Sequence, residues 1–310
     1  MQTEEELARL SPNKDTLLTI GVFDGVHLGH KYLLSQLTGQ AKERKLLSGV
    51  VTFCQHPLQV LSPQTELLFL TDLDRRIALL RDEGVDIIAL LSFTRETAEL
   101  NPTQFIHLLK KHLRMKGLVI GPDFALGKNR EGDIDTLRRM GEETGFTITI
   151  IPPVMIANEV ISSTAIRKAI TDGDMEKTAS FIGHPLRLYG QVVTGVGRGG
   201  QMGFPTANIA MASRQALPPD GVYATWAYID GKAHASVTNV GKRPTFGDNK
   251  RTVEVHILNY PDNLYGREME IDVAARLRGE KQFNNAGELA QQIAEDIKQG
   301  KAILCPRGED

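Results

Sequence analysis

The stretch LTIGVFDGVHLGH, residues 18–30, decides how the first half of the chain is organised. Its apolar start, together with Leu17, predicts a buried parallel strand that ends near Val22. Gly21 and Gly25 then allow a tight turn and a close approach of the backbone to another group. A strand that runs into such a turn predicts a binding site at the strand end.

Two histidines, His27 and His30, follow this turn, and an apolar helical pattern over residues 31–43 comes next. The spacing places two imidazoles near a helix N-terminus, where free N–H groups and the helix dipole favour an anion. An ordinary strand–turn–helix corner is the simpler explanation, and either histidine alone would favour it. The complete pattern G-x-F-D-G-x-H-x-G-H is far more specific, and it predicts a phosphate site for nucleotidyl transfer.

Length and composition indicate an ordinary globular protein with two domains. Of 310 residues, 41% are hydrophobic and 24% charged, and the formal net charge is -2. This balance excludes a general polyanion-binding surface, so we expect no nucleic-acid partner. We also expect no membrane association, because no apolar run spans a bilayer and the acidic N-terminus is unlike a secretory signal. Cys54 and Cys305 do not form a disulfide framework or a zinc signature, which indicates a cytoplasmic protein.

Strand and helix patterns alternate through the first half. Residues 1–13 predict a short peripheral helix or a frayed end. Strands are predicted at 17–22, 47–53, 85–91, 117–121 and 147–151, and helices at 31–43, 73–82, 102–112 and 135–145. This alternation predicts an α/β fold with a doubly wound parallel sheet, whose ligands bind beyond the C-terminal strand ends.

Polar motifs collect at these predicted strand ends. They are CQHP at 54–57, GPDFALGKNREGD at 121–133 and ISSTAIR at 161–167. In the second motif, Lys128 and Arg130 can meet phosphate. The third offers N-cap hydroxyls and places Arg167 one turn inside a helix predicted over 165–170. Plain helix capping would explain the third motif alone, but hydroxyls, a helix N-terminus and an arginine together also form a triphosphate cradle.

The pattern changes after residues 183–185 (GHP), which end a predicted helix over 172–182 and mark the domain boundary. Strands without helices between them are predicted at 188–194, 221–229, 232–240, 252–258 and 268–277. Such a series predicts an antiparallel barrel. An amphipathic helix over 286–298 is predicted to close the domain.

Two segments of this half carry further information. The segment GVGRGGQMGFPTANI, residues 195–209, lacks the ending of a Walker loop, so its glycines alone describe a flexible surface loop. The strand VEVHI, residues 253–257, places Glu254 and His256 on one face and its apolar residues on the other. A solvated outer face is the simpler explanation of this alternation.

Taken together, the motifs resemble the bacterial bifunctional riboflavin kinase/FAD synthetase family. In the first half the resemblance rests on GVFDGVHLGH, the TFxxHP segment, GPDFALGKNREGD and ISSTAIR, and in the second on GFPTAN, NVGKRPTFG, VEVHIL, LYG and RLRGEKQF. It covers nearly the whole chain. It implies a Rossmann-like FMN adenylyltransferase domain, residues 1–183, followed by a β-barrel riboflavin kinase domain, residues 184–310. The implied reactions are phosphorylation of riboflavin to FMN by ATP, and adenylylation of FMN to FAD with release of pyrophosphate.

The resemblance also implies roles for individual residues. At the triphosphate of the first domain it places His27, His30, Ser163, Thr164 and Arg167, with catalytic roles for the histidines and the arginine. Further ATP-binding residues there are Gly21, Phe23, Asp24 and Gly25. Flavin-binding residues are His56, Pro57, Asp123, Phe124 and Arg278, with Asp123 and Phe124 on the adenine or the flavin side. In the kinase domain, Gly197 and Gly203 contact ATP, Thr206 and Asn208 bind ATP and Mg²⁺, and Glu254 is the catalytic base.

One departure from the family is Cys54-Gln55, where the family usually has Asp-Pro. Pro57 is retained, so we expect the loop to persist with altered stiffness.

The two flavin acceptors explain why these residue types are needed. FMN presents an ionised phosphate, so adenylyl transfer needs positioning and charge stabilisation but no base. Riboflavin presents a neutral hydroxyl, so its phosphorylation needs a carboxylate such as Glu254 to take the proton. Oxygen ligands from Thr206 and Asn208 suit Mg²⁺.

Three alternatives stay open at this point. In the first, only one of the two sites is active, and the kinase is the better candidate. In the second, the chain is a flavin-binding regulator without chemistry. In the third, the histidine motif serves another cytidylyl or adenylyl acceptor. The presence of His27, His30 and Glu254 argues against the regulator, and the kinase-like half argues against another acceptor. The expected partners are ATP, riboflavin, FMN and FAD, and the oligomeric state is left open.

Overall fold

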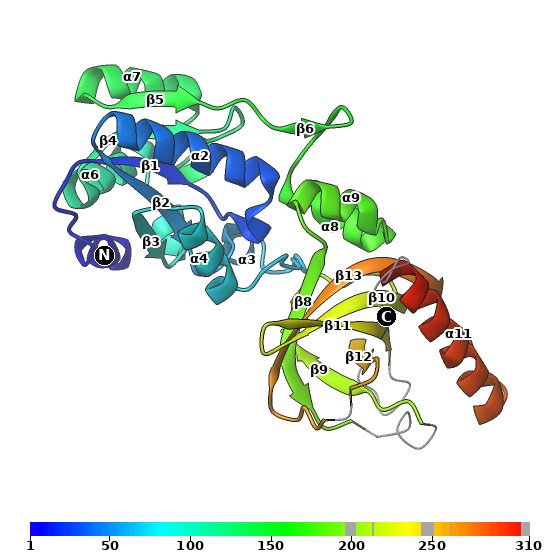
Figure 1. Ribbon diagram of the computed structural model, residues 1–310. Helices are drawn as coiled ribbons and strands as arrows, with labels where there is room; N and C mark the ends of the chain where they lie inside the picture. The colour runs from blue at the N-terminus through cyan, green and yellow to red at the C-terminus, as the bar shows by residue number, and fades with distance from the viewer. Residues whose placement is uncertain (196–202, 213, 243–250, 261, 305–310) are drawn as a thin grey trace. The chain divides into compact units, whose positions relative to one another are not determined.

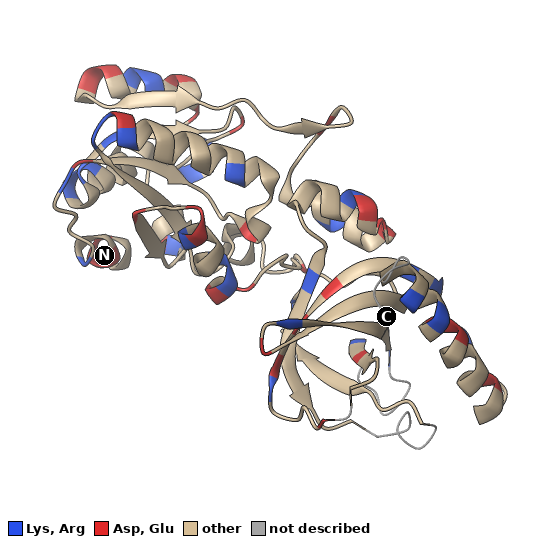
Figure 2. Ribbon diagram, viewed as in Figure 1, with Lys and Arg blue, Asp and Glu red and all other residues tan. Residues whose placement is uncertain are grey.

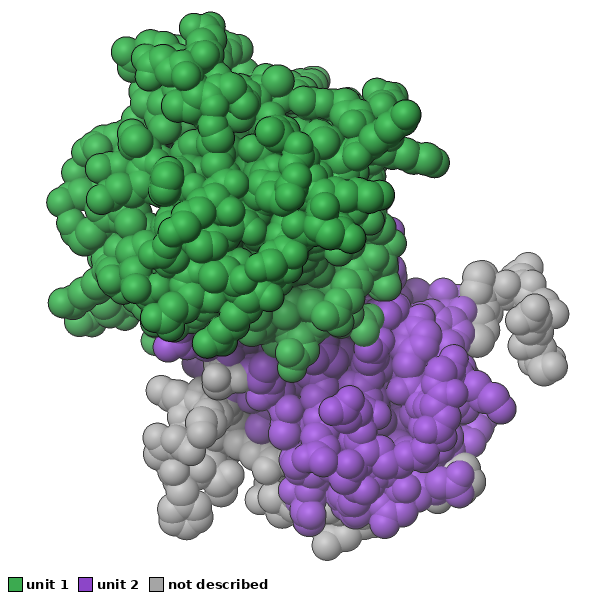
Figure 3. All heavy atoms as spheres, turned by 90° about the vertical axis from the view of Figure 1, so that its left-hand side faces the viewer, with its two compact units in different colours: residues 1–163 green, residues 164–310 purple. Residues whose placement is uncertain are grey.

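The computed structural model describes residues 1–195, 203–212, 214–242, 251–260 and 262–304. The chain forms two compact units, Met1–Ser163 and Thr164–Asp310 (Figure 3). Each unit has its own β-sheet. Within the described ranges, every helix is too short or too polar to cross a membrane.

The first unit is built on a five-stranded parallel sheet with the order β3-β2-β1-β4-β5 (Figure 1). The strands are β1 (Thr16–Ile20), β2 (Leu47–Phe53), β3 (Ile87–Leu91), β4 (Met115–Ile120) and β5 (Thr147–Ile150). Strand β1 is buried along its whole length, as expected for a parallel strand covered on both faces. The strand order reverses between β1 and β4, which confirms the predicted doubly wound sheet.

Helices cover both faces of this sheet. They are α1 (Gln2–Ala8), η1 (Asp24–Val26), α2 (Leu28–Glu43), α3 (Pro57–Leu61), α4 (Leu73–Asp82), α5 (Arg95–Ala98), α6 (Pro102–Leu113), η2 (Lys128–Arg130) and α7 (Ile134–Thr144). Residues of α1, α6 and α7 belong to one apolar cluster, and residues of α2 and α4 to another. Acidic and basic residues follow one another along α7 (Figure 2). A short hairpin of β6 (Met155–Ile156) and β7 (Glu159–Val160) comes after β5.

Two helices near the start of the chain differ from prediction. Helix α1 forms but is docked rather than frayed, because Thr3 and Leu7 are fully buried. Helix α2 begins three residues before its predicted start, because His27 is its N-cap and accepts a hydrogen bond from the His30 amide at 3.4 Å. Capping depends on one local side chain, which hydrophobic spacing does not report.

The second unit contains a closed barrel with the order β10-β11-β12-β9-β8-β13, which confirms the predicted barrel. Its strands, antiparallel to their neighbours, are β8 (Leu186–Val193), β9 (Ala207–Met211), β10 (Gly221–Ile229), β11 (Lys232–Lys242), β12 (Arg251–Ile257) and β13 (Glu268–Gly279). The sequence predicts five of these strands and misses β9, because glycines and Pro205 precede a strand of only five residues. Helix α11 (Ala286–Leu304) packs on β10, β11 and β13.

Two helices precede the barrel, α8 (Ser163–Asp172) and α9 (Met175–Ile182). The sequence predicts helices over 165–170 and 172–182; both form, but α9 starts three residues later than predicted, because Gly173, with a φ of 78°, lies between the two helices. Helix α9 packs on β8 and β13, with Phe181 and Ile182 buried.

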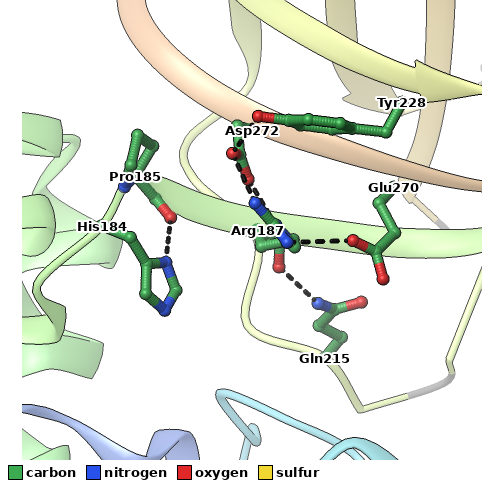
Figure 4. Close-up of polar contacts among 7 residues, drawn as sticks. All are labelled: His184, Pro185, Arg187, Gln215, Tyr228, Glu270 and Asp272. Carbon is green, nitrogen blue, oxygen red and sulfur yellow. Dashed lines mark hydrogen bonds and ion pairs between the residues drawn. The ribbon is translucent and has the colours of Figure 1, made fainter. Parts of the chain in front are cut away.

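A charged cluster joins β8 and β13, the first and last strands of the barrel in sequence (Figure 4). Arg187 donates to both carboxylate oxygens of Asp272, at 2.6 and 2.7 Å, and to Glu270 at 3.0 Å. The Tyr228 hydroxyl donates to Asp272 at 3.0 Å, and its ring centre lies 5.0 Å from the guanidinium carbon. Asp272 is only 4% exposed, so the pair is shielded from water and holds the two strands together.

We expect Asp272→Ala to lower the free energy of unfolding of the barrel by about 3 kcal/mol, because Arg187 loses its shielded partner. Trp226, the single tryptophan of the chain, lies opposite Asp272 in the sheet, so its fluorescence during urea unfolding reports this unit. The exposed pair Arg267–Asp230 supplies the control: Arg267→Ala should change stability by less than about 1 kcal/mol. Equal losses of stability in the two variants would contradict the conclusion that the shielded Arg187–Asp272 pair holds β8 and β13 together.

Candidate active sites

The chain that leaves β1 crosses the C-terminal edge of the sheet in a strained turn. Phe23, Gly25 and Val26 have φ values of 56°, 79° and 37°. Left-handed backbone at non-glycine residues is uncommon and concentrates at functional sites. Gly25 therefore meets the predicted need for a glycine, whereas Gly21 is not left-handed and instead lies close to the Phe23 ring.

His27 and His30 come together directly after this turn. Their rings stack with centres 3.7 Å apart and planes 19° from parallel. Burial, and to a lesser extent the neighbouring His27 ring, lowers the pKa of His30 well below its ordinary value. His30 is therefore neutral near pH 7 and acts through hydrogen bonding rather than through positive charge. Its Nδ1 is enclosed and has no hydrogen-bond partner among the described residues.

Asp24 holds the turn in place. It is 1% exposed, and its carboxylate accepts hydrogen bonds from the amides of Leu70 and Thr71 at 3.0 and 3.1 Å. Its backbone carbonyl accepts a hydrogen bond from the Ser163 hydroxyl at 3.1 Å. The structure thus brings predicted residues Asp24 and Ser163 together, through contacts that position the turn. Thr164 and Arg167 lie further along α8, in the second unit.

The loop after β2 leads directly into α3. His56 Nδ1 accepts a hydrogen bond from Leu58 N at 3.1 Å and caps α3, with Pro57 in the first turn. Gln55, which replaces the usual proline, donates from its amide to the Phe93 carbonyl at 3.0 Å. This bond ties the loop to the segment after β3. Cys54 is exposed.

In the loop over residues 121–133, the two basic side chains bind other residues of the chain at the surface. Lys128 pairs with Glu99 at 2.6 Å, and Arg130 donates to the Asp123 carbonyl at 2.8 Å. Phe124 packs partly against the core of the unit. The predicted contacts of Asp123 and Phe124 with adenine or flavin stay predictions.

The second site lies on the outer face of the barrel. Glu254 on β12 is directly opposite Asn208 on β9, so the structure brings these two predicted residues side by side. Asn208 is 7% exposed, and a Cβ on Gly195 would lie 2.0 Å from its amide nitrogen. Thr206 lies directly before β9. Gly197 is outside the described residues.

A pocket of about 540 Å³ adjoins the segment that leads into β9. It lies between residues 203–205, the end of β12 and α11, and it is lined by Gly203, Phe204, Pro205, His256, Ile257, Leu258, Asn259, Tyr260, Ile297 and Lys301. His256 Nδ1 and the Pro205 carbonyl are 2.8 Å apart. Of these residues the sequence predicts only Gly203 as a site residue, because the others meet through the packing of α11 and carry no local motif.

Arg278, predicted to bind flavin, has a protein partner in this structure. Its Nη2 and Nε lie 2.8 and 2.9 Å from the carboxylate of Asp296 on α11. The Phe283 ring centre lies 5.8 Å from its guanidinium carbon. Arg278 therefore joins α11 to β13, and its contact with flavin stays a prediction.

Comparison with known proteins decides the family. Residues 10–165 match the family described as FAD synthetase, and residues 182–304 match the family described as Riboflavin kinase. The Bifunctional riboflavin kinase/FMN adenylyltransferase of Escherichia coli (strain K12) is 38% identical over 92% of each chain. The protein of that name from Pseudomonas fluorescens is 34% identical over 99% of each chain.

This chain belongs to the bifunctional riboflavin kinase/FMN adenylyltransferase family. A crystal structure titled as a macrolide-efflux protein, from Streptococcus pneumoniae, has the same fold, with a TM-score of 0.88 and 29% identity over 97% of each chain. The FAD synthetase match ends near the start of α8, and the Riboflavin kinase match starts at the end of α9. Helices α8 and α9 therefore connect the two family domains.

The lowered pKa of His30 predicts a pH-dependent stability of the first unit. Between that pKa and the ordinary value of 6.5, the unfolded chain binds a proton that the folded chain does not. The free energy of unfolding should therefore fall as the pH drops below 6.5. His30→Asn should remove the share of this fall in the free energy of unfolding that comes from His30. Amide hydrogen exchange of β1 and β4 at pH 7.5 and 5.5 measures it. His107→Asn, at an exposed histidine of α6, should lose as much stability between pH 7.5 and 5.5 as the parent protein. The same decrease in His30→Asn would contradict the prediction.

Proposed function

We propose that the chain makes FMN and then FAD at two separate sites. The chain is a riboflavin kinase and FMN adenylyltransferase, and the observation that carries this conclusion is that both family domains match, one after the other. We assign the adenylyltransferase to the C-terminal edge of the parallel sheet and the kinase to the outer face of β9 and β12. The proposed setting is the cytoplasm, with no nucleic acid or membrane as partner.

At the adenylyltransferase site, the protein positions two anions and stabilises their charge. Imidazole N–H groups of His27 and His30 and the N-terminal amides of α2 donate to the ATP triphosphate. Ser163 supports this site through its hydrogen bond to the Asp24 carbonyl, and the roles of Thr164 and Arg167 at the triphosphate stay predictions. The FMN phosphate attacks the α-phosphorus, and pyrophosphate leaves; no base is needed because the phosphate is already ionised.

Neighbouring residues of the first unit complete this assignment. Gly21, Phe23, Asp24 and Gly25 shape the turn against which ATP binds. His56 and Pro57 line the flavin side, and Asp123 and Phe124 line the adenine or flavin side. Support for the role of Asp24 comes from its bonds to the 70–71 backbone, which fix the turn before His27.

At the kinase site, Glu254 takes the proton of the terminal ribityl hydroxyl as the γ-phosphoryl group arrives. ATP occupies the pocket beside Gly203, with Gly197 on the same glycine-rich segment, and Arg278 faces the flavin. The hydroxyl of Thr206 and the amide oxygen of Asn208 are donors that a hard cation accepts. They would hold Mg²⁺, which neutralises phosphate charge when it is bound with ATP.

The kinase domain is proposed to fold alone from residue 184 onward. A fragment of residues 184–310 should convert riboflavin to FMN, because it retains the whole barrel and α11. A fragment of residues 164–310 is the control; it keeps α9, which buries Phe181 and Ile182, and should be the more stable of the two. A folded 184–310 fragment that binds flavin and ATP but makes no FMN would refute the proposed boundary.

His27→Ala should stop FAD formation and spare FMN formation. Loss of one phosphate-stabilising donor costs about 3 kcal/mol of barrier, or roughly a hundredfold in rate. Incubation with riboflavin, ATP and Mg²⁺, followed by chromatographic separation of the flavins, should show FMN accumulating. His107→Ala, at an exposed histidine of α6, should make FAD normally. If the double variant His27→Ala/His30→Ala forms FAD at the parental rate, these imidazoles do not contribute to adenylyl transfer.

Glu254→Gln should have the opposite effect, because glutamine keeps the shape but cannot accept the proton. General-base loss costs about 10²–10⁴-fold in rate, so FMN formation should collapse while supplied FMN is still converted to FAD. Glu268→Gln, at an exposed carboxylate of β13, is the matched control. Riboflavin phosphorylation near the parental rate in Glu254→Gln would rule out Glu254 as the base.

A further inference from the structure

One row of residues crosses the outer face of the barrel through Glu254. Each member is directly opposite the next on the neighbouring strand, so their side chains share one face. In order from β8 to β13 the row is Val193, Asn208, Glu254, Asn239, Val222 and Arg278. Glu254 therefore has an asparagine on each side, and no role has so far been given to Asn239 on β11.

Asn239 has the properties of a ligand-binding residue. Asparagine is disfavoured inside strands, yet this one is in the interior of β11. It is exposed, and its side-chain amide has no hydrogen bond within the part of the chain that the structure describes. An exposed asparagine that only meets water would explain its exposure but not its place beside Glu254.

Gly241 brings the Glu280 carboxylate next to Asn239. Gly241, two residues further along β11, lies on the same face and carries no side chain. A Cβ there would lie 2.1 Å from Glu280 Oε1 and 3.5 Å from Asn239 Nδ2. The Glu280 carboxylate therefore occupies the space over Gly241 and borders Asn239 on this face.

The order of the row separates the two substrates. Asn208, on one side of Glu254, belongs to the proposed ATP and Mg²⁺ side. Asn239 lies on the other side, towards Arg278 on the proposed flavin side. Neighbouring strands are about 4.8 Å apart, so Glu254 and Arg278 are separated by roughly 14 Å of sheet. The ribityl chain, which joins the flavin ring to the hydroxyl that is phosphorylated, leaves Glu254 towards the flavin side, and Asn239 is the first residue of the row on that side.

We propose that Asn239 is a specificity-determining residue of the kinase site, whose amide binds a secondary hydroxyl of the ribityl chain. An amide offers donors and an acceptor to a hydroxyl. The contact turns the terminal hydroxyl towards Glu254. This inference rests on the proposed assignment of Glu254 as the base.

The test compares riboflavin with three analogues that lack the 2′-, 3′- or 4′-hydroxyl. A site built to bind a hydroxyl rejects the analogue without it. In Asn239→Ala, kcat/KM for riboflavin should fall at least about tenfold, while that for one analogue should be unchanged, so discrimination against that analogue is lost. Asn239→Leu, of similar size, should behave in the same way. The KM for ATP should not change.

Two controls keep the result clear. Asn263→Ala, at an exposed asparagine outside the row, should keep the parental discrimination. FAD formation from supplied FMN should be unchanged in every variant, because it takes place in the other unit. Parental discrimination against all three analogues in Asn239→Ala would overturn the proposal, as would a change confined to the KM for ATP. Failure of the base assignment is distinguishable, because Glu254→Gln would then phosphorylate riboflavin at the parental rate.

Discussion

The hydrogen bonds of the buried Asp24 carboxylate are the interaction on which the proposed adenylyltransferase site depends. A carboxylate that is 1% exposed requires several donors to offset its lost hydration. The amides of Leu70 and Thr71 supply them, and the Gly25 amide in turn donates to the Thr71 hydroxyl at 3.1 Å. These bonds hold a turn with three left-handed residues, and that turn delivers His27 to the N-cap of α2.

The two proposed sites solve opposite electrostatic problems. In the first unit both reactants are anions, and the site offers hydrogen-bond donors. The stacked histidines fit this task, because burial keeps His30 neutral and its Nδ1 enclosed. In the second unit the acceptor is a neutral alcohol, and a carboxylate is placed on an open barrel face between two asparagines. We thus assign adenylyl transfer to the parallel sheet of this chain and phosphoryl transfer to its antiparallel barrel.

Much of the fold could be predicted from the sequence, because periodicity reports burial. Continuous apolar runs marked the parallel strands, and alternation such as that of residues 253–257 marked the barrel strands. The elements that were predicted wrongly depend on features that do not repeat along the sequence. His27 started α2 early by capping it, Gly173 delayed the start of α9, and β9 followed a glycine-rich segment. Each of these depends on the conformation of one or two residues.

By itself the sequence determined the fold class, the order of the two domains and the motifs that name the family, because these depend on local patterns of residue type. Only the tertiary structure decided which residues meet. It tied Asp24 to a backbone 46 residues away, paired Arg278 with Asp296, and set Asn239 beside Glu254. The physical reason is that strand register and helix docking join positions far apart in the chain, and the energy that fixes them comes from burial and hydrogen bonds formed only on folding.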